Sequence, residues 1–83
     1  MIINFENYIS ATRTELEYYI NMVNGYKIND TAFGIEFSID GKRGIIEKLK
    51  HGYYINFDGV ADYGTKREIL NALESHWDGI TLQ

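Results

Sequence analysis

Residues 33–41 decide the fold of this chain, and they read Phe33-Gly34-Ile35-Glu36-Phe37-Ser38-Ile39-Asp40-Gly41. Apolar side chains occupy every second position and small or polar ones lie between them, which is the pattern of a strand with one buried face. Asp40 and Gly41 both tolerate positive φ, so they predict a two-residue hairpin turn at the end of this strand. We therefore expect an antiparallel sheet with one face in the core and the other in water.

Two more strands are predicted after this turn, over residues 42–50 and 53–57. His51 and Gly52 lie between them and predict a second tight turn. Turns this short join only neighbouring antiparallel strands, so the three strands form a meander. Residues 58–64 contain two glycines and are expected to be a loop.

The second of these strands has an ambiguous phase, because Ile45 and Ile46 are adjacent. We expect Ile45 to face the core, which places Lys48 and Lys50 on the open face beside Tyr54 of the next strand.

A helix is predicted on each side of the sheet sequence. The first has a mainly apolar stripe with residues three or four positions apart, namely Phe5, Ile9, Thr12, Leu16, Ile20 and Val23. Asn24-Gly25 predicts its left-handed end. The second begins at the capping box Thr65-Lys66-Arg67-Glu68, carries the stripe Ile69, Leu73 and Trp77, and ends at Asp78-Gly79.

The expected architecture is α+β: helix, three-stranded meander, helix, and a short edge strand at Ile80–Leu82. Each helix has a single apolar stripe, so both are expected on the same face of the sheet. The 83 residues are too few for two cores, which predicts one domain over residues 1–83.

The composition favours the cytoplasm. There is no cysteine, which excludes disulfides and thiolate metal sites, and the sequence has neither a signal-peptide pattern nor an apolar run long enough to cross a bilayer. We expect no membrane association. If the gene belongs to a phage, the location would be the cytoplasm of the host cell.

Motifs for catalysis and metal binding are missing from the sequence. His51 and His76 are the only imidazoles, and they lie in an expected turn and in the last turn of an expected helix. Asp58 and Asp62 share an expected loop but lack the further oxygen ligands of a calcium site. We therefore expect a protein that is not an enzyme and has no cofactor and no metal.

Tyrosine and carboxylate side chains are the best candidates for binding a partner. The chain has seven tyrosines, and adjacent pairs such as Tyr18-Tyr19 and Tyr53-Tyr54 cannot both point inward. Tyrosine is enriched at interface hot spots, and the net charge of −4 supplies carboxylates for a rim. The predicted partner-binding residues are Tyr18, Tyr54, Tyr63, Glu36, Asp40, Asp58 and Asp62.

Two alternatives remain open. Half of the eight basic residues lie in one predicted strand, so Lys42, Arg43, Lys48 and Lys50 could bind nucleic acid directly, although the pI near 5.0 opposes this. An open edge at 33–39 or 80–82 could instead pair with a second copy to form a homodimer.

In size, acidity and order of elements, the chain resembles small phage-encoded inhibitors of bacterial defence, including certain anti-CRISPR proteins. The resemblance is one of architecture, and no residue motif carries it. It implies a non-enzymatic inhibitor or adaptor, for which the acidic residues would mimic nucleic acid on a protein partner of unknown identity.

Overall fold

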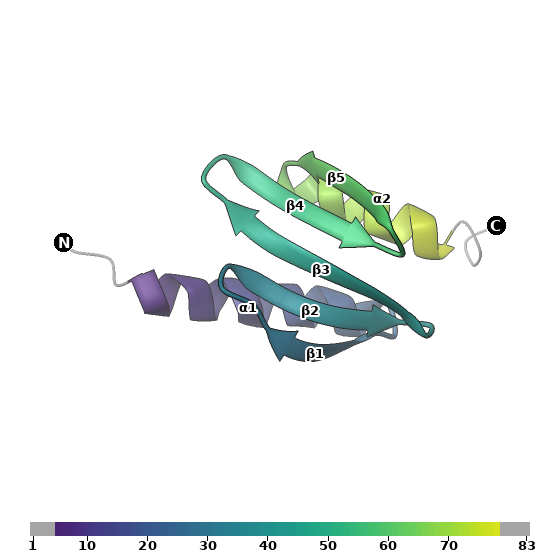
Figure 1. The fold of residues 1–83 in the computed structure, drawn as a ribbon, viewed down its shortest axis with the longest axis horizontal. Helices are drawn as coiled ribbons and strands as arrows, with labels where there is room; N and C mark the ends of the chain where they lie inside the picture. Colours follow the sequence, from purple (N-terminus) through teal and green to yellow (C-terminus); the bar gives the residue numbers. More distant parts are fainter. Residues whose placement is uncertain (1–4, 79–83) are drawn as a thin grey trace.

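The computed structural model describes residues 5–78, with the side chains of residues 8–74, as five strands in one sheet and two helices packed on one of its faces (Figure 1). Every neighbouring pair of strands is antiparallel, and the spatial order β1-β2-β3-β4-β5 follows the chain. The elements are α1 (Phe5–Met22), β1 (Tyr26–Asp30), β2 (Gly34–Ile39), β3 (Lys42–Leu49), β4 (Gly52–Phe57), β5 (Val60–Gly64) and α2 (Lys66–Asp78).

Tight turns fix this meander. Asp40 and Gly41 have φ of 54° and 78°, and Asp58 and Gly59 have φ of 54° and 83°, so both pairs form type I′ turns. The first of these turns was predicted. The turn between β3 and β4 is one residue earlier than expected, because Leu49 pairs with Gly52 and leaves residues 50–51 as the loop.

The helix ends follow the sequence signals. Asn24 has φ of 64°, and the N–H of Gly25 donates to the carbonyl of Ile20 at 2.9 Å, which ends α1 as predicted. At the start of α2, the N–H of Thr65 donates to Oε1 of Glu68 at 2.9 Å, and the N–H of Glu68 donates to Oγ1 of Thr65 at 3.1 Å. This is the expected capping box.

The α+β prediction is confirmed, but the three-stranded sheet was wrong: the sheet has five strands. No strand was predicted over β1, and residues 58–64, which contain β5, were expected to be a loop. Both are edge strands with little buried surface, so they lack the alternation by which the inner strands are detected. The predicted edge strand at 80–82 lies outside the described residues.

The predicted phase of β3 was also wrong. Ile46 is fully buried because it pairs with Ile35 on one side and Ile55 on the other, both of which face the core. Ile45 therefore faces the open side, and Lys48 lies opposite Tyr53 on the helix side. The register set by the Asp40-Gly41 turn, which pairs Ile39 with Lys42, decides this phase.

The core lies between the helices and the covered face of the sheet. Leu16 and Ile20 of α1 cover β1 and β2, whereas Ile69 and Leu73 of α2 cover β4 and β5. The rings of Phe37 and Phe57 stack at 5.7 Å between centroids across the central strand. Gly44 makes room for them, because a Cβ there would lie 2.6 Å from Cζ of Phe37. The helices thus leave the opposite face of the sheet uncovered.

Neither helix has the length and apolarity that a bilayer span requires, a statement that covers residues 5–78.

Candidate protein-binding face of the sheet

The open face is the side of the sheet that faces away from α1 and α2. Residues directly opposite each other in antiparallel strands point to the same side, so the strand registers define its rows. One row contains Glu36, Ile45, Asn56 and Ala61, and the next contains Gly34, Glu47, Tyr54 and Tyr63. A third row holds Tyr26, Ser38 and Arg43.

An aromatic pair dominates the β4–β5 side of this face. The rings of Tyr54 and Tyr63 lie 4.9 Å apart between centroids with an interplanar angle of 46°. Nδ2 of Asn56 donates to Oη of Tyr54 at 3.4 Å, whereas Tyr63 is 68% exposed. The pair offers a large apolar area with polar ends, which is the property that makes tyrosine effective at protein interfaces.

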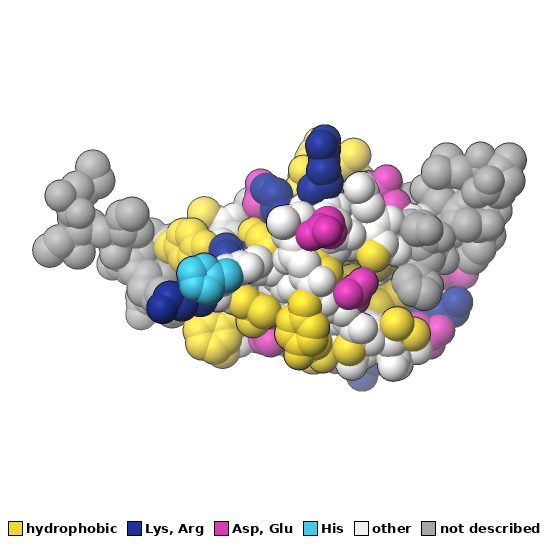
Figure 2. Space-filling model, turned by 90° about the horizontal axis from the view of Figure 1, so that it is seen from above, with side chains coloured by type: hydrophobic (Ala, Val, Ile, Leu, Met, Phe, Trp, Pro, Cys, Tyr) yellow, Lys and Arg dark blue, Asp and Glu magenta, His cyan; other side chains and the backbone are white. Residues whose placement is uncertain are grey.

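A shallow hollow of about 320 Å³ lies next to this pair. Ile45 on the central strand contributes its half-buried side chain, and the walls come from Tyr54 and Arg43. Glu36 and Asn56 line it as well and provide polar groups. Figure 2 views the molecule from the side of β5 and α2 and shows hydrophobic side chains along the lower rim, where the open face is seen edge-on.

The charged groups of the open face are few and largely paired. Glu36 accepts a hydrogen bond from Nδ2 of Asn29 at 3.2 Å and lies 3.9 Å from Nη1 of Arg43. Glu47 accepts a hydrogen bond from Oγ1 of Thr31 at 2.8 Å. The face is therefore tyrosine- and asparagine-rich, with a slight excess of negative charge.

The structure brings together three of the seven predicted partner-binding residues. Tyr54, Tyr63 and Glu36 share the open face. Asp40 and Asp58 lie apart from them in the two type I′ turns, which are at the same end of the sheet because β3 runs antiparallel to both β2 and β4.

The other two predicted residues point elsewhere. Asp62 lies on β5 opposite Ile55, a core residue, so it emerges on the helix side of the sheet. Tyr18 is two positions from both Leu16 and Ile20, the buried stripe of α1, and is 62% exposed on the outer side of that helix.

The basic residues proposed for nucleic acid do not form one surface. Arg43 is on the open face, Lys42 is at the hairpin end and Lys50 is in the next turn. The expectation that Lys48 lies on the open face was wrong, because its Nζ is 5.2 Å from the ring centroid of Tyr53 on the helix side. That amine donates to the carbonyls of the turn, at 2.6 Å to Leu49.

Ile45 is the main residue of this face that was not predicted. It was assigned to the core because adjacent isoleucines give no clear phase. Counting outward from the Asp40-Gly41 turn, with Ile39 opposite Lys42, would have placed Ile46 beside Ile35 and turned Ile45 outward.

The shifted pKa values belong to groups away from this face. Burial raises the pKa of Tyr53, and hydrogen bonds from Thr65 lower that of Glu68. A hydrogen bond to Asp30 raises the pKa of Lys27, and one to Glu15 raises that of Lys66. These shifts follow from packing, capping and ion pairing.

Among the described side chains of residues 8–74, histidine and carboxylate groups do not gather in any group of three that could hold a metal ion. His51 is an exposed turn residue, and the side chain of His76 lies outside the described part. No protein-family model, curated protein or solved structure matches this chain.

Proposed function

We propose that this chain is a small, non-enzymatic protein-binding module that engages a partner protein through the open face of its sheet. The observation that carries this proposal is the pair formed by half-buried Tyr54 and exposed Tyr63 beside the hollow over Ile45. An uncovered apolar area with polar surroundings on a small protein is typical of a binding surface. A partner could bury the two rings and insert a side chain into the hollow.

A protein partner is favoured over nucleic acid by the charges of this face. Glu36 and Glu47 would repel phosphate, and Arg43 is the cation that lies among them. Protein surfaces that bind nucleic acid have lysine and arginine side chains close to their aromatic groups. In this chain Lys42, Lys48 and Lys50 are dispersed. The alternative, that the basic residues of β3 bind nucleic acid directly, therefore has no single surface to support it.

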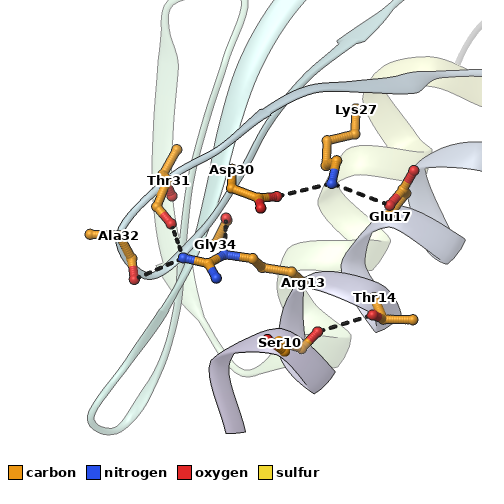
Figure 3. A network of polar contacts seen from close by, with 9 residues as sticks. All are labelled: Ser10, Arg13, Thr14, Glu17, Lys27, Asp30, Thr31, Ala32 and Gly34. Carbon is orange, nitrogen blue, oxygen red and sulfur yellow. Dashed lines mark hydrogen bonds and ion pairs between the residues drawn. The ribbon is translucent and has the colours of Figure 1, made fainter. Parts of the chain in front are cut away.

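Mimicry of a nucleic acid receives less support than recognition by tyrosine. Several carboxylates are paired with cations of the same chain: Glu15 with Lys66 at 2.8 Å, Glu17 with Lys27 at 3.7 Å, and Asp58 with Lys42 at 3.9 Å. The Glu17–Lys27 pair is drawn in Figure 3. Paired carboxylates present little of the continuous negative charge that a phosphate-binding cleft requires.

The test is affinity capture from a bacterial lysate, with nuclease-treated and untreated halves, using the wild-type chain and two variants. The Tyr54→Ala/Tyr63→Ala variant removes the aromatic pair, and Tyr18→Ala removes an exposed ring on α1. We expect a stoichiometric protein with the wild type and with Tyr18→Ala in both halves. The double variant should bind that protein at least about 30-fold more weakly, which is the loss of affinity expected when one hot-spot residue is truncated.

The outcomes separate the candidate functions. A partner that is lost with Tyr18→Ala and kept by the double variant would refute the open-face proposal. Recovery only from the untreated half would favour nucleic acid. A nuclease or other defence factor among the captured proteins would identify the inhibitor form of the proposal, which the resemblance in architecture suggests.

A further inference from the structure

The two edges of the sheet differ in how they are protected. The β1 edge has a register shift between Lys27 and Asn29 and carries a lysine, two features that hinder pairing with another strand. The β5 edge pairs regularly with β4 from Val60 to Gly64, without a bulge, a lysine or a proline. β5 is therefore the edge whose geometry suits strand addition.

The backbone groups of β5 that face away from β4 belong to Ala61 and Tyr63. Val60 closes the two-residue Asp58-Gly59 turn opposite Phe57, so this pair exchanges hydrogen bonds, and the bonded pairs then alternate along the ladder. The N–H and C=O groups of Ala61 and Tyr63 consequently point away from β4. Figure 2 shows white backbone and polar atoms on this side of the molecule, together with carboxylates.

A carboxylate lies over this edge. Oδ1 of Asp62 accepts a hydrogen bond from the N–H of Tyr63 at 2.8 Å, so the side chain covers one of the outward donors. Asp62 is at the middle of the five-residue strand and is exposed. Any strand that pairs with β5 displaces this carboxylate and must accommodate its charge.

We propose that β5 is a strand-accepting edge, and that Asp62 selects a partner strand with lysine or arginine opposite it while excluding a second copy of this chain. An antiparallel pair of two copies that used the outward groups of Ala61 and Tyr63 would place Asp62 opposite Asp62 of the partner copy. Like charges in opposite positions disfavour such a pair, whereas a cation there attracts the displaced carboxylate. The added strand would also lie next to Tyr63 and would widen the open face beyond β5.

The experiment uses the chain itself as the probe. ¹⁵N-labelled wild type is mixed with unlabelled Asp62→Lys, which presents the same strand with a cation at the central position. We expect each protein alone to sediment as a monomer and the mixture to form a heterodimer with a Kd below about 1 mM. The amide signals of Ala61 and Tyr63 should shift in the mixture, and added salt should weaken the association.

A matched control places the same charge change on the other edge. Asp30→Lys on β1 has the same net charge as Asp62→Lys, and we expect no association between it and the wild type. Asp62→Arg serves as a second probe should the lysine variant fold poorly. The edge proposal is refuted if folded wild type and either probe stay monomeric together at about 1 mM, or if the wild type alone dimerises through β5.

This inference does not rest on the proposed open-face function. Loss of association in the edge experiment leaves the capture result of the Tyr54→Ala/Tyr63→Ala variant unaffected, because capture depends on the two rings and sedimentation depends on the backbone edge.

Discussion

Arg13 connects α1 to the loop between β1 and β2 (Figure 3). Its Nη2 donates to the carbonyl of Thr31 and, at 3.4 Å, to that of Ala32, while Nε donates to the carbonyl of Gly34 at 3.3 Å. We predict that Arg13→Met, which keeps the aliphatic stem and loses all three hydrogen bonds, destabilises the fold by about 2 kcal/mol.

The magnitude follows from the geometry. A hydrogen bond from a charged donor contributes about 1.5–3 kcal/mol, but the bonds to Ala32 and Gly34 are long and the group is partly exposed. The hydrogen bond to the carbonyl of Thr31 therefore accounts for most of the expected loss of stability. A chain of this length has a free energy of unfolding of about 4–12 kcal/mol, so the loss is a large share.

Urea unfolding followed by circular dichroism measures this change, and a thermal scan should show Tm lower by about 8–16 °C. Thr14→Ala is the control on the same helix, since it removes only an exposed bond to the carbonyl of Ser10, and should stay within about 0.5 kcal/mol of the wild type. A value for Arg13→Met within that same margin would show that the contact to the loop does not stabilise the fold.

Two further predictions concern the sheet. Burial raises the pKa of Tyr53 above its unfolded value, so the stabilisation from its neutral form is complete below about pH 10 and is lost as pH rises through the folded pKa. Tyr53→Phe should reduce the fall in the urea midpoint between pH 8 and pH 11, and an unchanged pH profile would contradict this cause. Gly34→Ala should cost more than about 3 kcal/mol or prevent folding, because its Cβ would lie 1.9 Å from the carbonyl oxygen of Ile46. Wild-type stability of that variant in urea would show that β2 and β3 can separate without cost.

The parts of the fold that the sequence predicted correctly are those with a strong local signal. α1 and α2 have apolar stripes with a period near 3.6, and their ends have Asn24 and the Thr65–Glu68 capping box. The inner strands β2 and β4 alternate clearly because one of their faces is buried. These signals reside in a few consecutive residues, so they can be recognised without the rest of the chain.

The edge strands and the candidate surfaces depend on contacts between distant segments. β1 and β5 bury too little to alternate, and only their hydrogen bonds to β2 and β4 define them as strands. The pairing of Ile46 with Ile35 and Ile55 turned Ile45 outward and Lys48 inward. A shift of one residue would reverse every side chain of β3, so tertiary pairing had the decisive role.

The sequence by itself determined the two helices, the inner antiparallel strands, the hairpin turn at Asp40-Gly41 and the prominence of tyrosine. Only the tertiary structure decided which tyrosines meet: Tyr54 and Tyr63 form one pair on the open face, whereas Tyr18 lies on the outer side of α1. The reason is that local periodicity fixes which way a side chain points within its own element, while a shared surface requires the register between elements.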